Sequence, residues 1–234
     1  MEIDAALFDV FGTLVDWRSS VARDIDELLV RRRGEQLDPA AFADDWRRRY
    51  QPALSVVRRG ERPFVRLDVL HREMLEDTLR AYDCAPLDAG EQAWLADAWC
   101  RLEPWPDVVA GLERLRHHVL LAALSNGSVG MMARLARHAD LRWHAILGAE
   151  PVGAYKPDPR VYTTAAAWLG VEPRRCLMVA AHAADCAATA DLGFATAFVR
   201  RPHEYGVGGP PESPPAGTTV VVDSLEALAD EVGC

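Results

Sequence analysis

Residues 5–15 read AALFDVFGTLV, an apolar run that ends in one carboxylate, Asp9, and is followed by a Gly-Thr turn. A lone acid at the carboxyl end of a buried strand loses hydration and needs compensating partners. The same position suits chemistry, because open α/β sheets bind ligands outside the carboxyl ends of their strands. Asp9 is therefore a candidate functional residue; the alternative is that it only caps the turn at Gly12.

The composition narrows the class of protein. The chain has 234 residues, of which 50% are hydrophobic and 26% are charged, as is typical of a globular protein with a core and at most a smaller insert. Its net charge of −9 argues against a nucleic-acid partner, because such partners need a basic face. A small anionic substrate remains compatible with this charge, because its site needs only a few local cations.

Cysteine usage and the N-terminal residues bear on location. The 5 cysteines are widely spaced and form no C-x-x-C, which is typical of reduced thiols in a cytoplasm. Glu2 and Asp4 precede the first strand without a basic or apolar leader, so we expect no secretion signal. The longest plain apolar run, residues 119–124, is too short to span a bilayer. We therefore predict a cytoplasmic protein with no membrane partner.

The chain divides into two patterns. Residues 17–103 read as helical throughout, and after residue 104 short apolar runs alternate with helices. In the first part we predict helices over residues 20–33, from Pro39 through an apolar stripe ending at Leu54, and over residues 63–82 and 88–102. In the second part we predict strands over residues 119–124, 145–148, 176–181, 195–199 and 219–222, and a long Pro- and Gly-rich loop over residues 202–217.

Alternating short strands and helices predict an α/β fold built on a doubly wound parallel sheet. The first strand, residues 5–8 and onward, lies before the helical block and the other strands lie after it. The block is then an insertion into one loop of the sheet. We predict a core domain of residues 1–15 and 105–234, and an inserted all-helical domain of residues 16–104.

Polar side chains stand at several predicted strand ends. They are Asp9, Ser125 with Asn126, Lys156 in a Tyr-Lys-Pro-Asp run, and His182 with Asp185. In this order and spacing, the chain resembles the haloacid dehalogenase-like (HAD) superfamily over essentially its whole length. The resemblance implies a Rossmann-like core, with the helical block as the family's cap, hinged near Asp16 and Pro104.

Most members of that superfamily are phosphatases, which carry Asp-x-Asp in the first motif. Their second Asp is the general acid and its backbone helps to hold Mg²⁺, and their fourth motif adds one or two acids. Here these positions hold Phe11 and Ala181, and only Asp185 remains. Mg²⁺ requires several oxygen ligands, and a phenylalanine cannot protonate a leaving alkoxide. The residues therefore disfavour a Mg²⁺-dependent phosphatase, and we expect no metal and no cofactor.

Residues 9–17, DVFGTLVDW, are instead similar to the L-2-haloacid dehalogenase branch. The resemblance implies that Asp9 displaces halide from C2 of a short 2-haloalkanoic acid and forms an ester. Water then attacks the aspartyl carbonyl and releases the 2-hydroxy acid with inverted configuration. Desolvation against Phe11 is expected to strengthen the carboxylate as a nucleophile.

The resemblance assigns further roles by position. Lys156 keeps Asp9 ionised and Thr13 hydrogen-bonds its carboxylate. Ser125 and Asn126, with N–H groups of the following helix, hold the substrate carboxylate. The structural alternatives are a surface lysine, a plain turn threonine and an ordinary helix N-cap.

Two more residues match positions that the resemblance assigns to substrate binding. Arg47, after Trp46, matches the cap arginine that receives the halide; the alternative is a solvated basic face. Arginines 47–49 cannot all face one pocket, because successive helix positions point about 100° apart. Tyr162 follows Lys156 by one helical turn. Candidate apolar walls of the pocket are Phe11, Trp46, Tyr50 and Leu124.

The fourth motif departs from the best-known members of the branch, which carry Ser-x-Asn followed by Trp before the Asp. Here Ala180, His182 and Ala184 stand at these positions. Our hypothesis is that His182, with Asp185, serves as base or orienter for the hydrolytic water, because histidine titrates near neutrality. The alternative is a structural histidine that fills the asparagine site.

Other functions stay open at this point. They are a HAD-type phosphatase with a degraded Mg²⁺ site, a hydrolase of an unidentified non-halogenated substrate, and a non-catalytic binding protein. The intact Asp9 and Lys156 speak against the last. Family members similar to this chain are often homodimers, so a homodimer is a further expectation.

Overall fold

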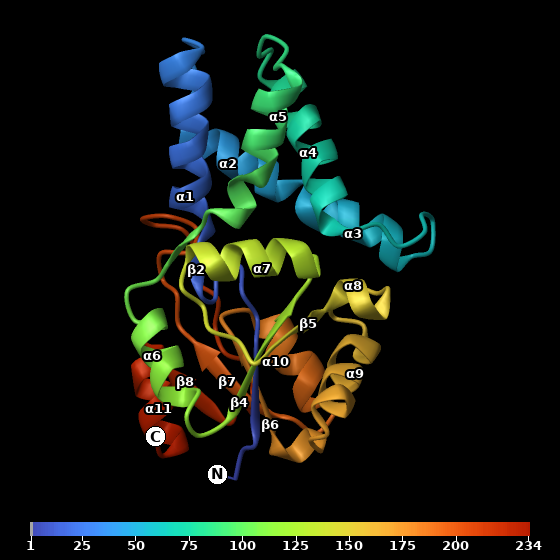
Figure 1. Ribbon diagram of the computed structural model, residues 1–234, viewed down its shortest axis with the longest axis vertical. Helices are drawn as coiled ribbons and strands as arrows, with labels where there is room; N and C mark the ends of the chain where they lie inside the picture. The colour runs from blue at the N-terminus through green and yellow to red at the C-terminus, as the bar shows by residue number, and fades with distance from the viewer. Residues whose placement is uncertain (1) are drawn as a thin grey trace.

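The computed structural model describes residues 2–234 and contains a six-stranded parallel sheet in the order β5-β4-β1-β6-β7-β8 (Figure 1). Its strands are β1 (Ala5–Phe8), β4 (Leu120–Ser125), β5 (Ala145–Gly148), β6 (Cys176–Ala180), β7 (Ala195–Val199) and β8 (Val220–Val222). The predicted α/β fold with a parallel sheet is confirmed.

Helices cover both faces of this sheet, as a doubly wound fold requires. Ala6 and Phe8 of β1 pack on the side of α6 (Val108–Leu115), α7 (Val129–His138) and α11 (Leu225–Val232). Ala5 and Leu7 point the other way, toward α9 (Pro159–Leu169) and α10 (Ala183–Ala190). This period of two in a strand buried on both faces explains why residues 5–8 are apolar without interruption.

Strand β1 lies at the centre of the sheet, and this places Asp9. After β1 the chain builds β4 and β5 on one side, and then returns to build β6 on the other. A crevice forms where the strand order reverses in this way, beyond the carboxyl ends of the strands. Asp9 follows β1 directly at that edge, and its backbone N–H donates to Val179 O at 3.0 Å.

The helical insert lies beyond the same edge of the sheet, at the top of Figure 1. It contains α1 (Trp17–Ile25), which continues as the π-helical η1 (Asp26–Arg32), then α2 (Pro39–Arg48), α3 (Tyr50–Arg58), α4 (Leu67–Ala81), α5 (Ala89–Ala96) and the 3₁₀ turn η2 (Asp97–Cys100). The chain enters and leaves this cap through two paired antiparallel strands, β2 (Val15–Asp16) and β3 (Glu103–Pro104). The predicted domain boundaries fall within this ribbon.

Local departures from the predicted elements have local causes. The helix predicted through Leu54 is interrupted at Arg49, because a continuous helix would place Pro52 in its interior without an N–H to donate. Helix α4 begins at Leu67 rather than at residue 63. The ribbon of β2 and β3 was not predicted, since strands of two residues are too short to show an alternating pattern. The short α8 (Ala149–Val152) and η3 (Pro173–Arg175) were also not predicted.

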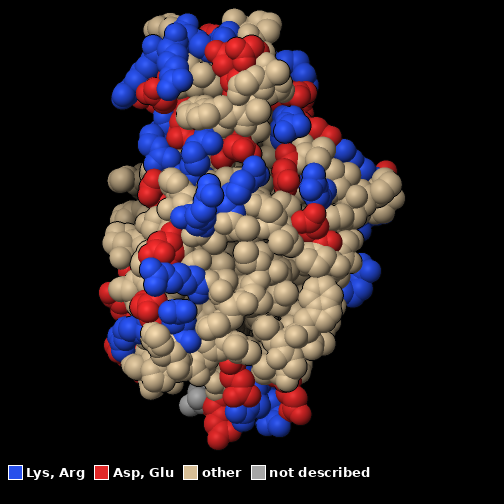
Figure 2. All heavy atoms as spheres, in the orientation of Figure 1, with Lys and Arg blue, Asp and Glu red and all other residues tan. Residues whose placement is uncertain are grey.

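The surface mixes both signs of charge. On the face drawn in Figure 2, lysine and arginine side chains are interspersed with aspartate and glutamate over the cap and the core. Among the described residues, the helices include none that is long and apolar enough to cross a membrane. The absence of nucleic-acid and membrane partners stays a prediction from the sequence.

Candidate active site

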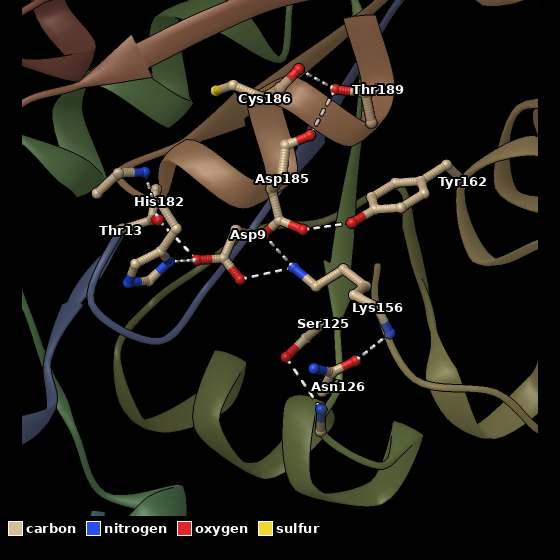
Figure 3. Close-up of polar contacts among 12 residues, drawn as sticks. Asp9, Thr13, Ser125, Asn126, Lys156, Tyr162, His182, Asp185, Cys186 and Thr189 are labelled. Atoms are coloured by element: carbon tan, nitrogen blue, oxygen red, sulfur yellow. Dashed lines mark hydrogen bonds and ion pairs between the residues drawn. The ribbon is translucent and has the colours of Figure 1, made fainter. Parts of the chain in front are cut away.

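The polar residues at the strand ends converge on one cavity of about 410 Å³ between the core and the cap. Figure 3 shows the side chains of Asp9, Lys156 and Asp185 pointing toward one another, with His182 on the opposite side of Asp9 from Lys156. The lining includes Asp9, Phe11, Arg47, Tyr50, Arg58, Ser125, Asn126, Lys156, His182, Asp185, Tyr205 and Glu212. Residues far apart in the sequence therefore form one site.

Lys156 bridges two carboxylates at the floor of the cavity. Its Nζ lies 2.7 Å from Asp9 Oδ1 and 2.7 Å from Asp185 Oδ2, and its side chain is only 6% exposed. Burial by itself favours the neutral amine, but the charges of Asp185 and Asp9 outweigh it and raise the pKa of Lys156 above its ordinary value. Lys156 is thus a buried cation and not a surface lysine.

Asp9 is held as a carboxylate. Burial alone raises the pKa of a carboxyl group, but the positive charges of Lys156 and His182 hold the pKa of Asp9 well below its ordinary value. Thr13 Oγ1 donates to Asp9 Oδ2 at 2.7 Å and itself accepts the N–H of Ala181 at 2.9 Å. Because the Ala181 N–H occupies the acceptor side of this hydroxyl, its single proton is directed to Asp9.

His182 does not pair with Asp185, contrary to our hypothesis from the sequence. Its Nδ1 lies 2.9 Å from Asp9 Oδ2, and its Nε2 lies 3.0 Å from Glu204 Oε1. Burial disfavours the charged ring, but the hydrogen bonds to Asp9 and Glu204 raise the pKa of His182 well above its ordinary value. The ring therefore lies between two carboxylates as an imidazolium.

The position of Tyr162 is also different from the one expected for a substrate-binding residue. Its hydroxyl donates to Asp185 Oδ1, the side chain is fully buried, and it does not line the cavity. Burial and the adjacent Asp185 raise the pKa of Tyr162 above its ordinary value, so it remains a neutral donor. Tyr162 therefore orients Asp185 from the protein interior and not from the cavity.

Ser125 and Asn126 lie at the end of β4, where the chain turns toward α7. Ser125 Oγ accepts the Gly127 N–H at 3.0 Å, while the N-cap of α7 is Ser128. Asn126 Oδ1 accepts the Lys156 N–H at 2.8 Å, and its Nδ2 donates to Tyr50 Oη at 2.9 Å. Asn126 thus links the core loop that carries Lys156 to the cap.

The cap contributes one arginine of the run 47–49 to the cavity. The guanidinium of Arg47 stacks over the ring of Tyr50 at 4.2 Å and lies 5.6 Å from that of Trp17. Arg48 is exposed and pairs with Asp45, and Arg49 donates to Thr78 Oγ1 at 3.1 Å. Arg47 therefore provides a cation held by aromatic faces at the cavity wall.

Two of the four candidate apolar walls line the cavity, and two do not. Phe11, edge-on to Trp99 at 5.8 Å, and Tyr50 are part of the lining. Trp46 is buried inside the cap, where its Nε1 donates to the His71 carbonyl at 3.1 Å. Leu124 is buried on the sheet face that α9 and α10 cover. An apolar residue near a motif is more often part of the core, and this holds for Trp46 and Leu124.

Glu204, Tyr205 and Glu212 were not predicted as site residues. All three lie in the loop after β7, inside the Pro- and Gly-rich stretch predicted over residues 202–217. Glu212 Oε2 accepts the Ala183 N–H at the start of α10 at 2.7 Å. An acid in an irregular loop has no periodicity that distinguishes it from a solvated one, so no local signal identified Glu204.

Asp9, His182 and Asp185 lie close enough to share a metal ion, since one donor atom of each falls within 4.8 Å of the others. The donor set does not fit Mg²⁺. Both oxygens of Asp9 and both oxygens of Asp185 already accept hydrogen bonds, from Lys156, Thr13, His182 and Tyr162. Only two carboxylates are present in this group, and a lysine ammonium lies between them, where a second cation would be repelled.

Known proteins are similar to this chain over nearly its whole length. The family model for haloacid dehalogenase-like hydrolases matches residues 3–193. The (S)-2-haloacid dehalogenase 4A of Burkholderia cepacia is 32% identical over 96% of this chain and 92% of its own. The (S)-2-haloacid dehalogenase of Pseudomonas sp. (strain YL) is 34% identical over 85% of this chain and 83% of its own.

A solved structure extends this likeness to three dimensions. The crystal structure of the defluorinating L-2-haloacid dehalogenase Rha0230 superimposes with a TM-score of 0.95 at 38% identity, over 99% of this chain and 96% of that one. The motifs, the fold and these matches agree: the chain belongs to the haloacid dehalogenase-like hydrolases, within the group of the (S)-2-haloacid dehalogenases.

Proposed function

We propose that this protein is a metal-independent hydrolase that converts a short (S)-2-haloalkanoic acid to the 2-hydroxy acid through an ester of Asp9. The observation that carries the proposal is the environment of Asp9. Its carboxylate is buried and held ionised by Lys156 at 2.7 Å, beside Phe11 in place of a general acid. A halide leaves without a proton, so the absence of an acid at residue 11 suits this leaving group.

In the first step Asp9 attacks C2 of the substrate, a C–O bond forms, and the carbon–halogen bond breaks with inversion. The substrate carboxylate binds at Ser125 and the N–H groups at the start of α7, where a helix N-terminus favours an anion. Arg47 receives the departing halide, and its stacking on Tyr50 keeps the guanidinium in the cavity. Phe11 excludes water from the nucleophile.

In the second step water attacks Cγ of the Asp9 ester. Asp185 accepts a proton from that water and returns it to the 2-hydroxy acid as the ester bond breaks. Lys156 and Tyr162 fix the Asp185 carboxylate for this task. Because the attack is on Cγ and not on C2, the inverted configuration of the first step persists in the product.

The occupied carboxylate oxygens of Asp9 and Asp185 speak against the phosphatase alternative, in which both would hold Mg²⁺. The ionised, buried Asp9 also speaks against a binding protein without catalysis, because a buried acid with a strongly perturbed pKa in a cavity is typical of a catalytic group. A hydrolase of a non-halogenated substrate would use the same two steps, and halide release distinguishes it.

The decisive experiment measures halide release from chloroacetate and from each enantiomer of 2-chloropropionate, with a chelator present. We expect release from the (S)-enantiomer without metal, and a loss of about 10⁴-fold or more in Asp9→Asn, since the nucleophile is removed. In a single turnover in ¹⁸O-water, the label should enter Asp9 and not the first product. Phosphate-ester cleavage that depends on Mg²⁺, without halide release, would contradict the proposal.

The partners that we propose are therefore a small anionic substrate and the released halide. The free state of the five cysteines in residues 2–234 supports a reducing, cytoplasmic location. A homodimer stays a prediction from the resemblance.

A further inference from the structure

Glu204 is a buried acid outside the motifs that define the site. Its side chain is only 3% exposed, and one oxygen, Oε1, accepts from both Trp17 Nε1 at 3.2 Å and His182 Nε2 at 3.0 Å. The turn after β1 packs directly against it, because a Cβ added at Gly12 would lie 2.2 Å from the same oxygen. Glu204 thus contacts the turn at Gly12 in the core, Trp17 at the start of the cap, and His182.

The segment that carries Glu204 is fixed to the core. Arg201 Nε donates to the Thr13 carbonyl at 2.8 Å, and its two terminal nitrogens pair with Asp107 at 2.8 and 2.9 Å. The Glu204 N–H in turn donates to the Arg201 carbonyl at 3.1 Å. A bidentate arginine pair of this kind fixes geometry, so Glu204 reaches His182 from a defined position.

The contacts of His182 decide its protonation. An ionised carboxylate only accepts hydrogen bonds, and His182 faces Asp9 through Nδ1 and Glu204 through Nε2. With both carboxylates ionised, both nitrogens carry a proton. A ring with no free lone pair cannot accept a proton from water, so it cannot be the base that we first expected.

The two oxygens of Asp9 differ in their partners. Within residues 2–234, Oδ1 accepts from Lys156 alone, whereas Oδ2 accepts from both Thr13 and His182. The oxygen with fewer donors is the better nucleophile, since each donor withdraws charge. Oδ1 then becomes the ester oxygen and Oδ2 the carbonyl oxygen, on which negative charge develops when water adds to Cγ.

We propose that the His182 Nδ1–H is an oxyanion donor in the hydrolysis of the Asp9 ester, and that Glu204 is the positioning residue that keeps this ring charged. The proposal rests on the function proposed above. When water adds to Cγ, its proton passes to Asp185 and the electron pair of the carbonyl moves onto Oδ2. When the tetrahedral intermediate collapses, the alkoxide leaves with that proton, and His182 remains protonated throughout.

The consequence is a specific pH dependence of ester hydrolysis. Two carboxylates contact the His182 ring, those of Asp9 after β1 and of Glu204 in the loop after β7. The other charged or titratable groups that line the same cavity are Arg47, Tyr50 and Arg58 of the cap, Lys156 before α9, Asp185 of α10, and Tyr205 and Glu212 of the loop after β7. Hydrolysis should be constant while the ring is charged, and should fall as pH rises through the pKa of His182. A histidine that acts as base would show the opposite slope.

The test variant is Glu204→Gln, which keeps the shape of the side chain and removes its charge. In rapid-quench experiments with (S)-2-chloropropionate we expect a halide burst of one per active site at nearly the wild-type rate. Ester hydrolysis should then slow by about tenfold or more at about pH 8, with recovery at lower pH, because a neutral His182 is a weaker donor. The ester should be visible by mass spectrometry.

Two further variants sharpen the test. Glu212→Gln removes a neighbouring acid that contacts the Ala183 N–H instead of His182. In this variant the fall in the ester hydrolysis rate at alkaline pH (the alkaline limb of the pH profile) should occur at the same pH as in the wild type. His182→Asn keeps an N–H donor without a titratable ring, so the part of the limb that depends on His182 should disappear. A limb that moves equally in Glu204→Gln and Glu212→Gln would overturn the assignment to Glu204.

An independent measurement needs no substrate. In protein with ¹⁵N-labelled histidine, the His182 ring should stay doubly protonated well above neutral pH, and should titrate at lower pH in Glu204→Gln. If Glu204→Gln hydrolysed the ester at the wild-type rate and its His182 ring titrated at the wild-type pH, the proposal would be overturned and the dehalogenase function would stand. If the wild type released no halide, the function would fail, and the ring titration would decide the role of Glu204 alone.

Discussion

The two oxygens of the Asp9 carboxylate each contact a cation that also contacts a second acid, but the two cations differ in their chemistry. On the Oδ1 side Lys156 bridges Asp9 and Asp185, and on the Oδ2 side His182 bridges Asp9 and Glu204. Each side thus places one cation between the nucleophile and a second acid. The lysine is charged at every working pH, because its pKa is raised from an already high value, whereas a histidine can lose its charge.

This difference assigns a separate task to each side. Lys156 keeps its charge at every working pH and so keeps the nucleophile ionised, whereas the hydrogen bond proposed from His182 to the developing oxyanion is strong only while its ring is protonated. The side chain of Lys156 is 6% exposed and that of His182 is 17% exposed, so the histidine side is also the one nearer to water. Water is the second substrate, which agrees with a role for His182 in ester hydrolysis.

The largest effect is expected on the lysine side, from Lys156→Met. The variant leaves two buried carboxylates, Asp9 and Asp185, without their common cation, and such a loss costs about 3–5 kcal/mol of unfolding free energy. The two acids should then share a proton, so halide release should fall at neutral pH and recover partly at alkaline pH. Urea unfolding and the pH profile of the burst measure both. Unchanged stability would mean that Lys156 does not hold these charges.

A smaller effect on the histidine side is expected from Gly12→Ala. Gly12 has a φ of +83° and its new Cβ would meet Glu204 Oε1, so both the backbone and the acid must shift. We expect a loss of about 2–3 kcal/mol and slower ester hydrolysis. Gly34→Ala is the matched control, because Gly34 has a φ of +75° and a Cβ added there would meet no atom of a non-neighbouring described residue within 4 Å.

In Gly34→Ala only the backbone strain remains, so stability should fall by about 1 kcal/mol, with ester hydrolysis as in the wild type. If both glycine variants lost the same stability and kept the wild-type hydrolysis rate, the close approach of Glu204 to Gly12 would contribute neither to stability nor to ester hydrolysis.

Among the variants of the site itself, the smallest effect is expected from Tyr162→Phe, again on the lysine side. The change removes one hydrogen bond to Asp185 and leaves its bond to Lys156 intact. We expect a loss of about 1–2 kcal/mol in stability, and a fall in kcat/KM of about tenfold at most with KM unchanged. A large rise in KM would instead return Tyr162 to the substrate-binding role inferred from the resemblance.

The fold was predictable because its signals are local. Each of the six strands of the sheet is a short apolar run, and Asp9, Asn126 and His182 follow such runs within two residues. Parallel strands bring their carboxyl ends to one edge, so Asp9, Ser125, Asn126, His182 and Asp185 were expected together. The break between α2 and α3 at Arg49 was also predictable from the sequence, because Pro52 is unfavourable in a helix interior.

The pairing of these residues was not predictable in the same way. His182 lies closer to Asp185 in the sequence than to any other acid of the site, yet its ring bonds to Asp9 and Glu204. Tyr162 matched a binding position, yet its hydroxyl points to Asp185 behind the cavity. The direction of a side chain depends on packing from several elements, which sequence spacing does not encode.

By itself, the sequence determined the parallel sheet, the helical insert and the group of proteins to which this chain belongs, because periodicity and short motifs are properties of neighbouring residues. Only the tertiary structure decided which second carboxylate pairs with His182. Glu204 lies in an irregular loop whose position depends on Arg201 reaching Asp107 and the Thr13 carbonyl, contacts that join residues 94 and 188 positions apart. Such long-range contacts form only when the whole core has packed, so no local sequence pattern predicts them.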